Sequence, residues 1–149
     1  MPSTHTSLYY HIVFSTQYRV AGIQESWQER LHSYLGGIIR GLKGTAVAIG
    51  GTSDHVHILA RLGAVHRLAD VIRDLKSNSS KWAHEVVGAR SFGWQDGYGA
   101  FSVSKSELEG LKPYIREQRN HHRKKTFKEE YLDLLRGNGV DFDEKFLWE

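Results

Sequence analysis

Strand-like and helix-like segments alternate along the first two thirds of the chain, and their order predicts an α+β fold. Short runs rich in β-branched and aromatic residues, typical of strands, occupy residues 8–15, 45–49, 55–61 and 100–104. Two longer segments, 24–42 and 66–87, have apolar residues at helical spacing. The order β-α-β-β-α-β is that of the ferredoxin-like fold, a four-stranded antiparallel sheet with both helices on one face. A C-terminal helix carrying a tyrosine is expected after this unit.

The first strand and the first helix rest on their periodicity. In residues 8–15 (LYYHIVFS), alternate residues such as Ile12 and Phe14 fall on one face, as in a strand. Apolar residues recur at helical spacing from Trp27 to Leu42. A lysine followed by a glycine then ends the helix, because a cation suits the last turn and glycine suits the residue beyond it.

The second and third strands are predicted to form a hairpin across the turn GGTSD at residues 50–54. The second helix follows, with apolar residues from Leu68 to Val86, and a glycine-rich loop at 88–99 leads to the fourth strand. In this topology the first and third strands are central, so the third strand lies in the middle of the sheet. Its histidines, His55 and His57, are expected on the face that the two helices leave open.

The third helix contains residues that do not suit a helix interior. Residues 106–109 (SELE) have the form of a capping box, but Gly110 and Pro113 follow just inside. We therefore predict a bend just before Tyr114 and a helix from there through Lys125. A single domain over residues 1–149 is expected, with a core at 1–105, a tyrosine helix at 106–126 and a tail at 127–149. The tail is expected to be a helix with an irregular end, packed on this chain or on a second subunit.

The composition excludes several kinds of protein. The chain of 149 residues has no cysteine, so disulfides, thiolate zinc sites and a cysteine nucleophile are excluded. No run approaches 18 apolar residues and the N-terminus has no apolar stretch, so we expect a cytoplasmic protein without a membrane partner. A formal charge of +3 does not by itself indicate a nucleic-acid partner.

The predicted third strand carries two histidines on one face. In the sequence Asp54-His55-Val56-His57, the histidines are two residues apart, and side chains in a strand alternate between its faces. Two neighbouring imidazoles suit a divalent cation, because imidazole is a common metal ligand. A histidine pair of this kind is more often an ordinary part of a strand, so a further ligand is needed to support a metal site.

The predicted third helix can supply that ligand. Tyr114 and Gln118 are four residues apart and therefore lie on the same side of a helix. Gln118 would offer an oxygen as the third ligand, and Tyr114 would place its phenol beside the cation. Six cations make this the most basic stretch of the chain: Lys112, Arg116, Arg119, Arg123, Lys124 and Lys125. A metal, a phenol nucleophile and a basic surface together indicate attack on a phosphodiester of a nucleic acid.

With the histidine pair and the YxxxQ spacing, the chain resembles the single-tyrosine HUH transposases of the insertion sequence 200/605 type. Further matching stretches are YHIVFSTQYR at 10–19, LKSNSSKW at 75–82, WQDGYGAFSVS at 94–104 and the histidine pair at 121–122. The histidine pair alone is weak evidence, whereas the ordered set is specific. Gln17 departs from the pattern, which has a lysine at that place.

The resemblance implies a mechanism. His55, His57 and Gln118 would hold Mg²⁺ or Mn²⁺, and Tyr114 would attack single-stranded DNA to form a 5′-phosphotyrosine and release a 3′-hydroxyl. Strands could then be rejoined without ATP. Such proteins recognise DNA hairpins at the ends of their elements and act as homodimers with the active site shared between subunits. The candidate DNA contacts are Arg19, Lys76, Lys81, Arg116, Arg119, His121, His122 and Arg123; the two histidines of this set are not predicted to be metal ligands.

Two other classes of function remain open. One is a relative that binds hairpins without cleaving them, or a domesticated relative that processes palindromes in its own genome. The other is a phosphoesterase acting on small nucleotides, with a metal or with two histidines. The two-histidine form needs two H-x-S/T motifs, and the chain does not contain two. Neither form would make a covalent link between protein and DNA.

Overall fold

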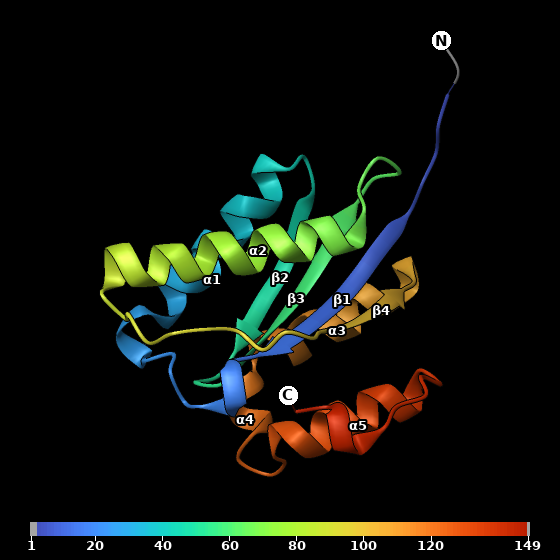
Figure 1. Cartoon of the computed structure of the whole chain (residues 1–149). Helices are drawn as coiled ribbons and strands as arrows, with labels where there is room; N and C mark the ends of the chain where they lie inside the picture. Colours follow the sequence, from blue (N-terminus) through green and yellow to red (C-terminus); the bar gives the residue numbers. More distant parts are fainter. Residues whose placement is uncertain (1–2, 149) are drawn as a thin grey trace.

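A computed structural model describes residues 3–148 and contains the predicted four-stranded antiparallel sheet (Figure 1). Its strands lie in the order β2-β3-β1-β4, so the predicted central position of the first and third strands is confirmed. The bounds are β1 (Leu8–Ser15), β2 (Thr45–Gly51), β3 (His55–Leu62) and β4 (Gly99–Val103). In the register of β1 and β3, Val13 lies opposite His57 and Ser15 opposite His55.

Two long helices cover one face of the sheet, as predicted (Figure 1). They are α1 (Glu25–Gly41) and α2 (Leu68–Trp82), and α2 continues into a π-helical segment, Ala83–Val87. The core between helices and sheet is apolar, with Phe14, Leu35 and Leu75 fully buried. This layer explains the apolar periodicity of the first half of the chain, since every second strand residue and one stripe of each helix point into it.

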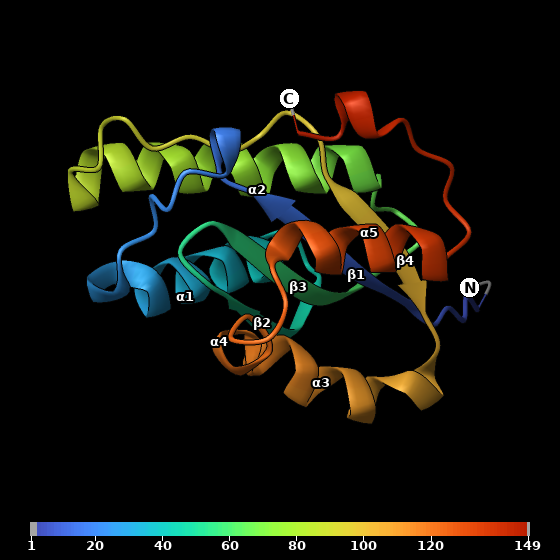
Figure 2. The same ribbon diagram turned by 90° about the horizontal axis from the view of Figure 1, so that it is seen from below.

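The other face of the sheet, predicted to be open, is covered by the C-terminal part of the chain (Figure 2). This part consists of α3 (Leu108–Arg116), α4 (Gln118–His121) and α5 (Phe127–Gly137), with short 3-10 turns at Lys105–Glu107 and Glu144–Phe146. A further 3-10 turn, Gln17–Arg19, follows β1. Helix α3 packs on β2 and β3, whereas α5 packs over β1 and β4. The second face is therefore a second apolar layer, and the strand residues that point toward it lie beneath α3 and α5.

The predicted bend before Tyr114 is wrong. Helix α3 runs without interruption through Pro113, and the break comes at Glu117, where the backbone leaves the helical region (φ −103°, ψ 35°). Leu108 and Ile115, on either side of the proline, are both buried against the sheet, and this packing stabilises a continuous helix although proline removes one hydrogen bond. The predicted helix to Lys125 is also wrong, because α4 ends at His121. The capping box is formed by Ser104 and Glu107, two residues earlier than predicted.

The tail packs on its own chain. Helix α5 has a capping box formed by Thr126 and Glu129, and its buried residues Phe127 and Tyr131 pack against Val13 of β1. The tail was expected to pack either on this chain or on a second subunit, and the structure shows it packed on this chain. The consequence for the site is direct, since α5 closes the space beside the β3 histidines.

Helix α3 is held close to the sheet by a glycine. A Cβ placed on Gly50 would lie 1.8 Å from the carbonyl oxygen of Ile115, which belongs to the backbone and cannot move aside cheaply. We expect Gly50→Ala to push α3 away from β2 and to lower the free energy of unfolding by about 1–3 kcal/mol or more. Urea denaturation measures this. The matched control is Gly41→Ala in α1, where an added Cβ meets nothing within 4 Å and is expected to be neutral or stabilising; equal losses in both variants would contradict the prediction.

Candidate metal centre

The two histidines predicted as ligands lie on the face of β3 that α3 and α5 cover. Both side chains are completely buried. Their rings are 5.1 Å apart between centroids and nearly perpendicular, at 77°. The prediction that the period of the strand brings them together is confirmed, but they are enclosed and not exposed on an open face.

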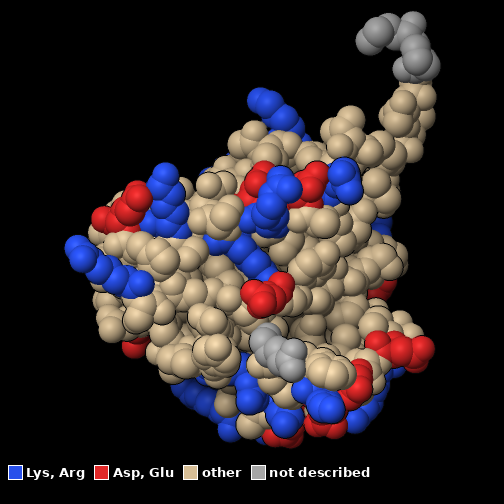
Figure 3. All heavy atoms as spheres, viewed as in Figure 1, with Lys and Arg blue, Asp and Glu red and all other residues tan. Residues whose placement is uncertain are grey.

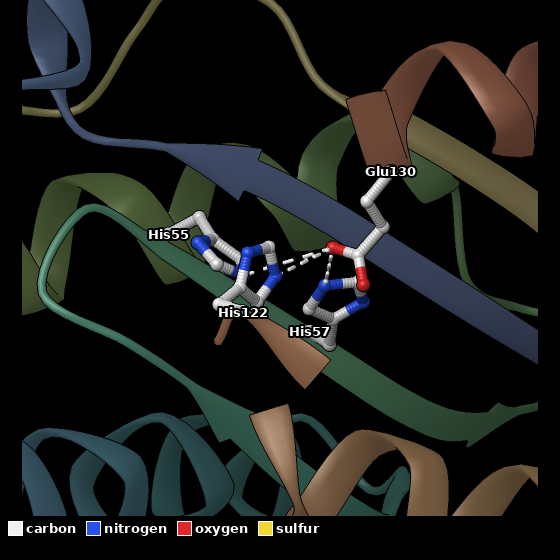
Figure 4. Close-up of side chains that lie close together, drawn as sticks. All are labelled: His55, His57, His122 and Glu130. Carbon is white, nitrogen blue, oxygen red and sulfur yellow. Dashed lines mark hydrogen bonds and ion pairs between the residues drawn. The ribbon is translucent and has the colours of Figure 1, made fainter. Parts of the chain in front are cut away.

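Two more groups, His122 and Glu130, join these histidines (Figure 4). The carboxylate oxygen Oε1 of Glu130 lies 2.8 Å from Nε2 of His57, 3.2 Å from Nε2 of His122 and 3.8 Å from Nε2 of His55. One ligand atom from each of the four residues lies within 4.8 Å of those of the other three. We call His55, His57, His122 and Glu130 the histidine cluster.

Glu130 also contacts the tyrosine predicted as the nucleophile. Its Oε2 accepts a short hydrogen bond from the hydroxyl of Tyr114, while Oε1 faces the histidines. Burial would raise the pKa of Glu130, but hydrogen bonds from His122, His57 and Tyr114 hold that pKa well below its usual range. Burial, followed by the hydrogen bond to Glu130 and its charge, raises the pKa of Tyr114 above its usual value. A charged carboxylate thus links a neutral phenol to the cluster.

Gln118 lies at the cluster because of the helix break at Glu117. Because of this break, the carbonyl oxygen of Tyr114 has no regular helical partner. The side-chain Nε2 of Gln118 donates to that oxygen at 3.0 Å. This bond fixes the orientation of the amide, so Oε1 points at the histidines. That oxygen lies 3.0 Å from Nε2 of His55 and 3.0 Å from Nε2 of His122. The structure therefore brings the predicted third ligand to the predicted pair.

The hydrogen bonds of His55 leave a place for a positive charge. Its Nδ1 is 2.7 Å from Oδ1 of Asp54. Burial would raise the pKa of Asp54, but its bond and charge interaction with His55 lower it, so the carboxylate accepts and Nδ1 carries the proton. The Nε2 of a neutral His55 then presents a lone pair to Oε1 of Gln118, which is also an acceptor. Two acceptors 3.0 Å apart need a second proton on His55 or a cation between them.

The donor set fits a divalent cation. It combines three imidazole nitrogens, a carboxylate oxygen and an amide oxygen, and all five side chains except the half-buried His122 are buried. Asp54 fixes the ring of His55 from behind, an arrangement that holds many metal-binding histidines in place. Imidazole, carboxylate and amide groups are all ligands that divalent cations use in proteins, so the residues present fit a cation of the kind that the resemblance implies.

A cleft leads from the surface to this site. Its volume is about 1140 Å³ and it is lined by residues of α3 and α5 and of the segment between them, including Tyr114, His122 and Glu130. Lys124 and Lys125 line it too, although Lys125 is paired with Asp133. Figure 3 shows Lys and Arg gathered along the lower rim of the molecule, where α4 and α5 lie, with Asp and Glu between them. The entrance of the cleft thus carries charges of both signs.

The predicted DNA contacts have different surroundings. Lys76 is engaged within the protein, because its Nζ donates to three backbone carbonyls, those of Gln95, Asp96 and Gly97, at 2.7–3.1 Å. The remaining lysine and arginine candidates fall into three groups. Arg19 stacks over the ring of Trp148, Arg116 and Arg119 bond to β2 and α1, and Lys81 and Arg123 are exposed. His121 packs against the ring of Tyr114 at 4.7 Å. Their roles in DNA binding remain predictions.

Sequence reasoning missed two members of the cluster. It placed His122 among the DNA contacts, and it gave Glu130 no role. A signal for Glu130 was available, because this acidic residue falls within the apolar stripe formed by Phe127, Tyr131 and Leu135 in α5. A carboxylate in a buried stripe needs partners, and the histidines of β3 are the groups that it meets.

Stability is expected to fall in mild acid. Burial, together with the neighbouring His57, lowers the pKa of His11 to about 3, and burial with the neighbouring His55 lowers that of His32 to about 4. Between pH 6.5 and these values the unfolded chain binds protons that the folded chain does not, so unfolding becomes easier as the pH falls. Urea midpoints at pH 7.5 and pH 5 test this, with a flatter dependence expected for His32→Phe than for a variant of the exposed residue His5. Identical midpoints at the two pH values would contradict it.

The fold and the cluster together define a class, namely α+β proteins that place a histidine-rich candidate metal site and a tyrosine on one face of an antiparallel sheet. The family model described as "Transposase IS200 like" matches residues 4–118. The chain belongs to this IS200-like transposase family. The match ends at Gln118, so α5 and its glutamate lie outside it.

Solved structures support the fold. A crystal structure of a candidate transposase from Deinococcus radiodurans R1 has 21% sequence identity and a TM-score of 0.63, and the alignment covers 77% of this chain and 93% of that chain. A REP-associated tyrosine transposase bound to a REP hairpin has 12% identity and a TM-score of 0.55, over 77% of this chain and 70% of that chain. No curated protein matches the sequence. None of the helices in the described residues is both long and apolar enough to cross a membrane.

Proposed function

We propose that this chain is a metal-dependent DNA strand transferase in which Tyr114 attacks a phosphodiester of single-stranded DNA. One observation carries the proposal: in this member of a transposase family, the carboxylate of Glu130 contacts both Tyr114 and the histidines of β3. A phenol beside a candidate cation site, at the end of a cleft, is the arrangement that phosphoryl transfer to a tyrosine requires.

In this proposal His55, His57 and Gln118 hold the cation, with His122 and Glu130 as further ligands from the C-terminal part of the chain. A cation bound there would polarise the scissile phosphate and offset the negative charge that develops on it. Asp54 orients His55, and the amide of Gln118 is oriented by the backbone of Tyr114. The residue that attacks and one of the proposed ligands are thus four positions apart and linked by a hydrogen bond.

The chemistry of this chain's own residues follows from these contacts. The phenolic oxygen of Tyr114 forms a bond to phosphorus and the bond from phosphorus to the 3′-oxygen breaks, which leaves a 5′-phosphotyrosine and a 3′-hydroxyl. The proton of the phenol passes to Oε2 of Glu130, which already accepts its hydrogen bond. The departing 3′-oxygen takes a proton from water. One phosphodiester replaces another, so attack by a 3′-hydroxyl on the phosphotyrosine can rejoin strands without ATP.

The proposed partner is single-stranded DNA that carries a hairpin. Support comes from the family and from the relative whose structure contains a REP hairpin. Within a single chain Tyr114 already lies beside its own histidines, with ring centroids of Tyr114 and His57 5.9 Å apart. We therefore propose that the site assembles in cis, in place of the shared site that the resemblance implies, and that a homodimer would bring two complete sites together.

Incubation with labelled single-stranded DNA from the regions flanking the gene tests the proposed function. We expect a species that resists denaturing electrophoresis, forms with Mn²⁺ and is absent with a chelator. The species should resist denaturation because Tyr114 is covalently bonded to the DNA, and heating in detergent does not break that bond. Binding of several flanking hairpins without any covalent species would contradict the proposal and favour a hairpin-binding module that does not cleave.

A further inference from the structure

A third buried histidine lies on the face of the sheet that α3 and α5 cover, and it has no part in the proposed chemistry. His11 of β1 is 3% exposed, and its nitrogens do not belong to the histidine cluster. Its Nε2 lies 2.7 Å from Nδ1 of His57, and the two rings stack with centroids 5.0 Å apart and planes at 25°. His11 therefore contacts a proposed ligand on the side away from the cluster.

The position of His11 follows from the register of the sheet. Val13 of β1 is directly opposite His57, and His11 is two residues before Val13 on the same face. Diagonal neighbours of this kind lie close enough for ring side chains to touch. Phe101 of β4 flanks the ring of His11 at 6.1 Å, and the ring of Tyr114 meets it edge-on at 6.4 Å. These two sides of the ring pack against aromatic groups, and its Nε2 makes the hydrogen bond to His57.

The protons of this pair are determined by the groups around it. Nε2 of His57 is 2.8 Å from Oε1 of Glu130, and a carboxylate can only accept, so this nitrogen carries the proton in the metal-free protein. The Nδ1 of a neutral His57 then accepts, and Nε2 of His11 donates to it. A cation at the cluster needs the lone pair of His57 Nε2. The proton of His57 must then sit on Nδ1, and Nε2 of His11 must become the acceptor.

We propose that His11 is a positioning residue that holds the ring of His57 in both arrangements, as donor without the cation and as acceptor with it. An imidazole can fill both roles because its single proton can occupy either nitrogen. A carboxylate, such as Asp54 behind His55, can only accept. This inference rests on the proposed metal site, and it adds a residue of β1 to the groups that prepare the cluster for a cation.

Two variants separate the hydrogen bond from the packing. His11→Phe fills the space without a hydrogen-bonding atom, whereas His11→Gln keeps both a donor and an acceptor. The measurement is the affinity for Mn²⁺ alone, by titration calorimetry or electron paramagnetic resonance. We expect His11→Phe to weaken Mn²⁺ binding by about 10–100-fold, as is usual when the partner behind a metal-binding histidine is lost, and His11→Gln to stay within about threefold of the wild type.

A second measurement does not depend on any variant folding. In ¹⁵N-labelled wild-type protein, long-range nitrogen–proton spectra report which nitrogen of His57 carries the proton. We expect Nε2 without metal, and Nδ1 after addition of a diamagnetic cation, Mg²⁺ or Zn²⁺. A proton on Nδ1 in the metal-free protein, or a folded His11→Phe variant that binds Mn²⁺ as tightly as the wild type, would overturn the inference alone. A wild type that binds none of these cations would overturn the metal site of the proposed function, and the accepting role of His11 with it.

Discussion

Tyr114→Phe is expected to abolish the covalent link to DNA and to leave DNA binding unchanged. The phenol oxygen is the atom that forms the bond to phosphorus, and phenylalanine removes that atom while it keeps the ring. The loss should reach the limit of detection, at least about 1000-fold, because a nucleophile has no substitute in its own reaction. Denaturing electrophoresis of labelled DNA measures the covalent species, and a native gel measures binding.

A matched control is available in the same chain. Tyr131 of α5 is also buried and packs against aromatic rings, but its contacts are with Phe127 and Trp148 and lie outside the cluster. We expect Tyr131→Phe to form the covalent species at close to the wild-type level. An unchanged yield from Tyr114→Phe would refute the assignment of the nucleophile, whatever the result for Tyr131.

The second large effect concerns the cation. We expect His55→Ala to weaken Mn²⁺ binding by more than about 100-fold, since the loss of a ligand should exceed the 10–100-fold cost of losing the group behind one. The same variant should lose metal-dependent cleavage. The change also removes a buried partner of Asp54 and Gln118, so the unfolding midpoint must be measured beside the affinity.

His84→Ala provides the comparison for this experiment. His84 is a half-buried histidine that bonds to the carbonyl of Phe92 on the opposite layer of the protein, away from the cluster. Its loss should affect stability without altering the affinity for Mn²⁺. Mn²⁺ binding by His55→Ala at wild-type strength would mean that the cation, if any, is held elsewhere.

The first layer of the fold could be predicted because its signals are local. Alternation in LYYHIVFS and helical spacing from Trp27 to Leu42 depend only on burial against one face, and both elements lie where predicted, within a residue or two. The third helix was predicted wrongly because its course depends on distant packing. Gly50 admits the backbone of α3 against β2, and this contact outweighs the usual effect of Pro113.

The site could be predicted only as far as its spacings are local. The offset of two residues from His55 to His57 and of four from Tyr114 to Gln118 follows from the periods of a strand and a helix, and the structure brings these four residues together. Glu130 could not be found in this way, since α5 reaches the cluster only by folding back across the sheet after a loop. The same holds for His11, whose contact with His57 depends on the register of two strands.

Mass spectrometry of the covalent species tests the central claim most directly. After digestion with nuclease and trypsin, the account predicts nucleotide mass on the peptide 106–116, which contains Tyr114 as its only tyrosine, and a 5′-phosphodiester linkage to that residue. The peptide should remain unmodified when the metal is chelated. Nucleotide mass on a different peptide, or a linkage through a 3′-phosphate, would contradict the account.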